Sequence, residues 1–153
     1  MLDLYEEFRS IIKTLERHNL EYAVCGGLAV ALHGLQRATM DIDLLILASS
    51  LEAVSQAVAK LGYDIKGLPM TFKGGAVEIR CISKIDPASG DLMRLDLLLV
   101  TPEVEQVWHT RQQTAWEEGV LWVVSREGLI RLKTLGGRPQ DLADIARLQE
   151  EGQ

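Results

Sequence analysis

The chain has 153 residues, 47% of them hydrophobic and 25% charged, which fits one ordinary globular domain. A net charge of −6 excludes the overall basic footprint of a non-specific nucleic-acid binder, although a local basic patch can still serve an RNA substrate. No apolar run approaches the roughly 20 residues that span a bilayer, and the acidic first residues do not resemble a signal peptide. We therefore expect a cytoplasmic protein without a membrane partner, whose cysteines, Cys25 and Cys81, are reduced and buried.

Apolar spacing and capping residues predict helices at both ends of the chain and strands mostly between them. The predicted helices cover residues 3–17, 26–33, 49–61, a short stretch from 102, 125–135 and 139–150. The predicted strands cover residues 21–25, 42–47, 71–72, 77–82, 93–100 and 120–124. This order indicates an α+β fold with a mixed sheet flanked by helices. We expect residues 1–124 to form the core and residues 125–153 a short helical extension packed on it.

A glycine pair marks the point where the first predicted strand becomes a helix. Gly26 and Gly27 follow an apolar strand, and a compact helix begins directly after them. Glycine permits positive φ and allows a phosphate to approach the backbone, and the unpaired N–H groups of a starting helix attract anions. A plain tight turn is the alternative for this pair taken alone.

Three aspartates are candidate metal ligands. Asp41 and Asp43 point to the same face of a strand, about 6.6 Å apart along the chain, whereas Ile42 between them points into the core. Asp96 lies in a later strand among leucines, where an ionised carboxylate needs a partner. If the two strands pair, the carboxylates converge and can hold two Mg²⁺ ions roughly 4 Å apart. The alternatives are a turn or cap role for Asp41 and a salt bridge from Asp96 to Arg94 or Arg80.

Basic residues near these motifs can bind phosphate. Arg37 precedes the aspartates and can grip a phosphate with two hydrogen bonds, or it is a solvated loop arginine. Lys133 can reach a triphosphate as a point charge, or it is a surface lysine lying along apolar neighbours. His33 is expected to pack or cap rather than to catalyse. Asp141 falls in the first turn of its helix, where a structural role explains it equally well.

The order of these motifs resembles the nucleotidyltransferase superfamily with the DNA polymerase β fold. The likeness rests on the glycine pair, on the stretch Arg37-Ala38-Thr39-Met40-Asp41-Ile42-Asp43, and on a third carboxylate at Asp96. The first stretch and the tail from Leu132 to Ile145 look like the AbiEii-type nucleotidyltransferases, which include toxins of bacterial toxin–antitoxin systems. Those toxins have a larger C-terminal domain, so an antitoxin or partner subunit is a further expected partner.

The resemblance implies a polymerase β-like fold and a role for each motif. Asp41, Asp43 and Asp96 are expected to be catalytic and to bind Mg²⁺, with Mn²⁺ as a substitute and an NTP as substrate. The candidate nucleotide-binding residues are Gly26, Gly27, Arg37, Thr39, Lys133 and Asp141.

Three functions are compatible with these motifs. The first is a Mg²⁺-dependent transfer of a nucleoside monophosphate to tRNA or protein, as in a toxin-like enzyme. The second is the same transfer to a small molecule such as an antibiotic. The third is a non-catalytic nucleotide-binding subunit or regulator, which an intact set of three carboxylates disfavours.

Overall fold

The computed structural model describes residues 1–34, 41–117 and 119–151 of the chain. The α-helices are α1 (Leu4–Arg17), α2 (Gly26–Leu32), α3 (Leu51–Ala59), α4 (Glu105–His109), α5 (Arg126–Gly136) and α6 (Pro139–Glu151). The strands are β1 (Ala23–Cys25), β2 (Asp41–Ile46), β3 (Ile65–Lys66), β4 (Met70–Phe72), β5 (Val77–Ile85), β6 (Leu92–Leu99), β7 (Gln112–Trp116) and β8 (Gly119–Val123). The predicted elements are found within a few residues of their expected ends, and β3 and β7 are additional.

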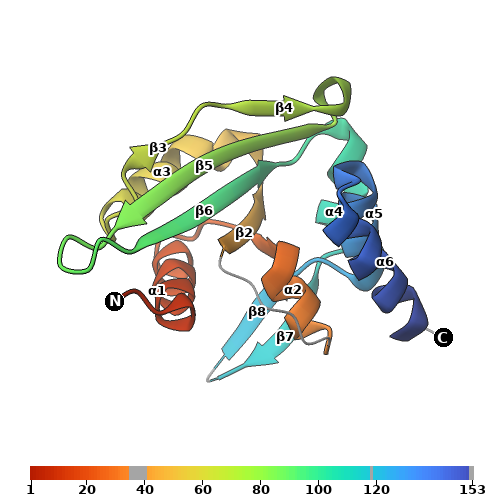
Figure 1. The fold of residues 1–153 in the computed structure, drawn as a ribbon, viewed down its shortest axis with the longest axis horizontal. Helices are drawn as coiled ribbons and strands as arrows, with labels where there is room; N and C mark the ends of the chain where they lie inside the picture. Colours follow the sequence, from red (N-terminus) through yellow and green to blue (C-terminus); the bar gives the residue numbers. More distant parts are fainter. Residues whose placement is uncertain (35–40, 118, 152–153) are drawn as a thin grey trace.

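One mixed sheet connects the whole molecule, and helices lie against it (Figure 1). Its strand order is β3-β5-β6-β2-β1-β8-β7, with β4 paired to β5. Strand β2 pairs antiparallel with β1 and parallel with β6, and β5 pairs antiparallel with β6. The predicted α+β class is therefore confirmed, and the two strands that carry the candidate aspartates are direct neighbours.

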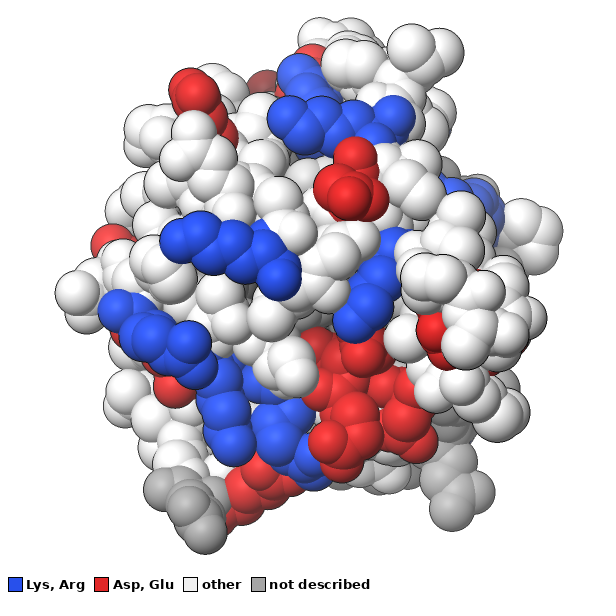
Figure 2. Space-filling view, turned by 90° about the vertical axis from the view of Figure 1, so that its left-hand side faces the viewer, with Lys and Arg blue, Asp and Glu red and all other residues white. Residues whose placement is uncertain are grey.

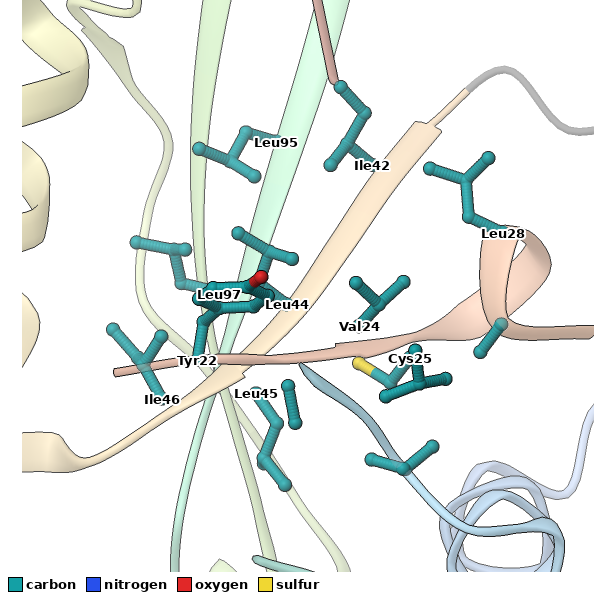
Figure 3. Packing of buried hydrophobic residues seen from close by; sticks show 14 of the residues in the cluster. Tyr22, Val24, Cys25, Leu28, Ile42, Leu44, Leu45, Ile46, Leu95 and Leu97 are labelled. Carbon is teal, nitrogen blue, oxygen red and sulfur yellow. The ribbon is translucent and has the colours of Figure 1, made fainter. Parts of the chain in front are cut away.

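The sheet separates an apolar face from a face that carries polar groups. Because side chains alternate along a strand, Leu44 and Leu97 share one face, and both are fully buried. Figure 3 shows them packed with Tyr22 in the main hydrophobic core. Helix α1 lies on this side, since Glu7 forms an ion pair of 2.9 Å with Lys84 of β5. The candidate aspartates point to the other face.

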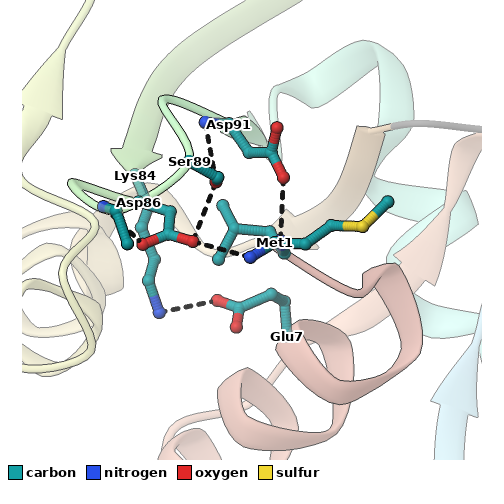
Figure 4. Close-up of polar contacts among 8 residues, drawn as sticks. Met1, Glu7, Lys84, Asp86, Ser89 and Asp91 are labelled. Carbon is teal, nitrogen blue, oxygen red and sulfur yellow. Dashed lines mark hydrogen bonds and ion pairs between the residues drawn. The ribbon is translucent and has the colours of Figure 1, made fainter.

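Polar contacts hold the N-terminal residues against the loop between β5 and β6. The ammonium group of Met1 donates to Asp86 at 2.9 Å, and the amide of Leu2 donates to Asp91 at 3.1 Å (Figure 4). On the side of the molecule drawn in Figure 2, a patch of acidic side chains is bordered by basic side chains. This side therefore lacks the uniformly basic surface expected of a general nucleic-acid binder.

Helices α5 and α6 contact each other, and α5 also contacts α2 and α4. Leu129 of α5 and Leu148 of α6 belong to the main buried core. We retain the division into a core of residues 1–124 and an extension of residues 125–153 as a proposal.

Neither cysteine is in a disulfide; Cys25 is buried as expected, whereas Cys81 is only partly buried. Among the helices in the described ranges, none combines the length and the apolar character needed to cross a membrane.

Candidate active site

Two cysteines and two aspartates form a row across four neighbouring strands of the sheet. Cys25 of β1 lies opposite Asp43 of β2, Asp43 lies opposite Asp96 of β6, and Asp96 lies opposite Cys81 of β5. Residues paired in this way point to the same face of the sheet. The register therefore brings Asp43 and Asp96 side by side, as the sequence predicted, with Cys25 and the glycine turn at one end and Cys81 at the other.

The glycine turn packs directly against Asp43. Gly26 has φ +66°, and a Cβ atom added there would lie 2.1 Å from Oδ2 of Asp43. Only glycine both adopts this left-handed conformation without strain and leaves room for the carboxylate. The first residue of α2 is thus fixed by its neighbour in space, which connects the two motifs that the sequence separates.

Asp43 is the most strongly perturbed carboxylate of the row. Burial, followed by the negative charges of Asp96 and Asp41, raises its pKa from 3.8 to about 7. Lys133 and Arg138 act in the opposite direction and lower this pKa, so both basic groups lie within electrostatic range of the row. Asp41 is exposed, and its charge is one of those that raise the pKa of Asp43.

Asp96 is buried and already has a cationic neighbour. Nε of Arg94, two residues earlier in β6, donates to Oδ1 of Asp96 at 2.8 Å. This contact realises the salt-bridge alternative considered for Asp96, and it coexists with the register that faces Asp96 toward Asp43. Arg94 also lies opposite Asp41 in the register of β2 and β6, so it neighbours two of the three aspartates.

The donor set fits a divalent cation in part. Asp43 and Asp96 are hard oxygen donors in register, and their mutual repulsion is the kind of cost that a cation relieves. Within residues 1–34, 41–117 and 119–151, however, no three His, Cys, Asp or Glu side chains are grouped tightly enough to hold a metal ion. The pair Asp43–Asp96 fits a cation, and the participation of Asp41 remains a prediction.

Lys133 is buried between two helices rather than lying on the surface. Its side chain is 5% exposed, and Nζ lies 2.9 Å from Oδ2 of Asp144 and 3.6 Å from Oδ1 of Asp141. The alternative of a surface lysine is therefore wrong. Lys133 and Asp141, both predicted for the nucleotide site, come together here, and in this arrangement Lys133 acts on the aspartate row by its charge.

Arg138 is a candidate phosphate ligand that sequence reasoning did not select. Its Nε donates to Oδ2 of Asp141 at 2.8 Å, yet 74% of its side chain is exposed. The negative charges of Asp43 and Asp96 contribute to the raised pKa of Arg138, after the bond to Asp141 and opposed by burial. Its place directly before Pro139, after the basic helix α5 and three residues before Asp141, was the signal that could have identified it.

Of the remaining residues singled out in the sequence, the structure describes His33 but not Arg37 or Thr39. Nε2 of His33 lies 3.0 Å from the carbonyl oxygen of Val124, which agrees with the expected packing role. Arg37 and Thr39, predicted to bind nucleotide, lie outside the described residues.

Comparison with known proteins places this arrangement among nucleotide-transferring enzymes. The family model of aminoglycoside-2''-adenylyltransferases matches residues 7–83, which include the glycine turn, Asp41 and Asp43. Proteins with curated descriptions gave no significant match.

Solved structures resemble the chain over nearly its full length. The lincosamide antibiotic adenylyltransferase LnuA, bound to lincomycin, superposes with a TM-score of 0.62 at 18% identity, covering 94% of this chain and 95% of that one. A candidate nucleotidyltransferase from Thermotoga maritima gives a TM-score of 0.62 at 13% identity, with coverage of 96% and 92%. ANT(2'')-Ia in complex with adenylyl-2''-tobramycin gives 0.57 at 16% identity, with coverage of 92% and 84%. These likenesses establish the polymerase β-like nucleotidyltransferase fold.

Proposed function

Because the chain belongs to the aminoglycoside-2''-adenylyltransferase family and is a nucleotidyltransferase, we propose that it transfers a nucleoside monophosphate from an NTP to a hydroxyl group of a small molecule. The observation that carries this proposal is the register of Asp43 with Asp96, next to a glycine turn that packs on Asp43. The family consists of enzymes, so we set aside the non-catalytic alternative.

We infer that the row of residues has a nucleotide end and an acceptor end. Gly26 and Gly27 lie at the β1 end, which we assign to the triphosphate, and Asp43 follows them. Asp96 and Cys81 lie at the β5 end, which we assign to the acceptor. The nucleotide and the acceptor would thus meet above the pair Asp43–Asp96.

Each residue of the site has a distinct task in the transfer. The acceptor oxygen forms a bond to the α-phosphorus, the bond from that phosphorus to the β-phosphate oxygen breaks, and pyrophosphate leaves. Asp96, in register with Asp43, takes the proton of the hydroxyl. Asp43 and Asp41 would hold the phosphate-side cation, and Arg138, positioned by Asp141, neutralises phosphate charge. A bound Mg²⁺ or Mn²⁺ supplies charge stabilisation and lowers the pKa of the attacking hydroxyl.

The similarity of the chain to antibiotic adenylyltransferases favours a small-molecule acceptor over tRNA or protein. The matching family and two structural neighbours, LnuA and ANT(2'')-Ia, are described as adenylyltransferases of antibiotics. The mixed charges on the side shown in Figure 2 agree with this choice. The AbiEii-type likeness, with a tRNA or protein acceptor and an antitoxin partner, stays a prediction from sequence.

An acceptor panel tests the proposal. Purified protein is incubated with Mg²⁺, each labelled NTP in turn, and an aminoglycoside, a lincosamide, bulk tRNA or bacterial protein. We expect label on a small molecule with release of pyrophosphate, and loss of at least about 100-fold in rate for Asp43→Asn, since metal and phosphate positioning depend on this carboxylate. Label on tRNA or protein alone would favour the toxin-like reading and contradict ours.

A further inference from the structure

Arg94 is a close neighbour of two of the three aspartates of the proposed site, Asp41 and Asp96. It lies opposite Asp41 in the register of β2 and β6, while Asp96, to which it is bonded, lies opposite Asp43. The bond from Nε to Oδ1 of Asp96 is 2.8 Å long and is the largest cause of the raised pKa of Arg94, to which Asp41 also contributes. The guanidinium group therefore lies within the field of two carboxylates, Asp96 and Asp41.

The side chains of Arg94 and Asp96 differ in how much of each is exposed to solvent. The Arg94 side chain is 42% exposed, whereas the Asp96 side chain is 12% exposed. A half-exposed guanidinium can exchange its bond to a carboxylate for water at little cost, because exposed ion pairs contribute little to stability. The buried carboxylate cannot make this exchange and needs another cation when the arginine leaves.

Within the described residues, the three aspartates do not form a compact group of metal ligands. Like charges in register on neighbouring strands repel each other. Arg94 offsets this repulsion for Asp96 from within its own strand, and its side chain takes up the carboxylate oxygen that a cation would use. A monovalent protein cation and a divalent metal ion thus compete for one carboxylate.

We propose that Arg94 is a positioning residue that serves as an internal counterion. It holds Asp96 until a divalent cation binds between Asp43 and Asp96, and it then releases Asp96 and turns toward solvent. This inference rests on the proposed transfer site, whose acceptor-side cation it regulates. No covalent bond changes in this step; one ion pair is replaced by metal coordination.

Direct measurement of Mn²⁺ binding tests the competition. Isothermal titration and electron paramagnetic resonance give the Kd of Mn²⁺ for the nucleotide-free protein and for Arg94→Gln. We expect the variant to bind Mn²⁺ about tenfold more tightly, because the competing cation is gone. A purely structural arginine predicts the reverse, since its loss would leave Asp96 disordered or protonated and would weaken Mn²⁺ binding.

Two further variants locate the effect. Arg80→Gln is the matched control, because Arg80 bonds Glu78 at 3.1 Å within β5 and lies on the other face of the sheet from Asp96. We expect its Mn²⁺ affinity to equal that of the wild type. Asp43→Asn added to Arg94→Gln should abolish the gain, because the cation then lacks its second carboxylate. Circular dichroism and thermal unfolding confirm that each variant is folded.

The outcomes separate this inference from the proposed function. Unchanged or weaker Mn²⁺ binding by folded Arg94→Gln, a gain that survives Asp43→Asn, or no Mn²⁺ binding by either protein would overturn the role of Arg94. Tighter binding by Arg94→Gln together with no transfer to any acceptor would leave the counterion intact and count against the proposed function alone. Transfer by the wild type with an unaltered Mn²⁺ affinity in Arg94→Gln would count against Arg94 alone.

Discussion

At the scale of single residues, Asp43 is perturbed first by its burial and then by neighbouring negative charges. Burial together with the charges of Asp96 and Asp41 raises its pKa to about 7, so its carboxyl group is partly protonated near neutral pH. A divalent cation reverses this preference by favouring the ionised form. We therefore expect proton release from Asp43 to accompany metal binding.

Stability measured in the presence of a chelator tests this perturbation. Folded Asp43 keeps its proton up to about pH 7, whereas the unfolded chain releases it near pH 3.8. Between these values the unfolded state binds fewer protons, so this carboxyl makes the free energy of unfolding fall as the pH rises. Asp43→Asn should lose that contribution and show a smaller fall over the same range in urea titrations with EDTA.

The control for this experiment is Asp64→Asn, an exposed carboxylate outside the row. It should retain the wild-type pH dependence. If Asp43→Asn and wild type lose stability equally from pH 4 to pH 7, the carboxyl of Asp43 is not perturbed as described.

The sequence identified many residues of the candidate site, but which of them contact one another could be seen only in the folded structure. The shared face of Asp41 and Asp43 followed from alternation along a strand, and the apolar flanks of Asp96 marked it as a carboxylate that needs a partner; both are local properties of the sequence. The burial of Lys133 did not follow, because its partner Asp144 lies on the next helix, beyond the break at Gly137. The choice between Arg94 and Arg80 as partner of Asp96 also depended on which face of the sheet each arginine occupies.

At the scale of elements, the turn from β1 to α2 and the strand β2 form one structural unit. Gly26 adopts φ +66° and leaves space for the Asp43 carboxylate, so the turn fixes where that carboxylate lies. Any side chain at this position would have to displace either the strand or the carboxylate.

A pair of glycine substitutions separates backbone strain from this steric contact. Gly74 has φ +65° with nothing within 4 Å of an added Cβ, whereas Gly26 has φ +66° with Asp43 at 2.1 Å. Gly74→Ala should lose about 1–2 kcal/mol of unfolding free energy from strain alone. Gly26→Ala should lose about 1–3 kcal/mol more and should also weaken Mn²⁺ binding. Equal losses in urea unfolding, with unchanged Mn²⁺ affinity, would show that the contact with Asp43 is unimportant.

The strands that sequence patterns missed are those with little apolar content. β7 begins Gln112-Gln113-Thr114 and forms an edge of the sheet, so it carries no run of apolar side chains to identify it. β3 is two residues long, and both are exposed. By contrast, the capped helices α1 and α5 were predicted closely, because Asp3 and Ser125 accept the expected amide hydrogen bonds.

At the scale of the whole molecule, the order of the strands brings together groups that are far apart in sequence. The glycine turn, the Asp41–Asp43 strand and the Asp96 strand are neighbours, and α5 and α6 bring Lys133 and Arg138 within electrostatic range of Asp43. This assembly is why a chain with a net charge of −6 offers positive charge beside its acidic row. Strand order could not be predicted from composition or spacing, because the parallel pairing of β2 with β6 joins segments separated by several other elements.

The most direct measurement is a crystal structure of the protein with Mn²⁺ and a non-hydrolysable NTP, with the manganese located by anomalous scattering. Our account predicts a manganese peak bridging Asp43 and Asp96, with the triphosphate extending toward Gly26 and Arg94 no longer bonded to Asp96. Manganese bound elsewhere, or a nucleotide seated away from the glycine turn with the carboxylate pair empty, would contradict it.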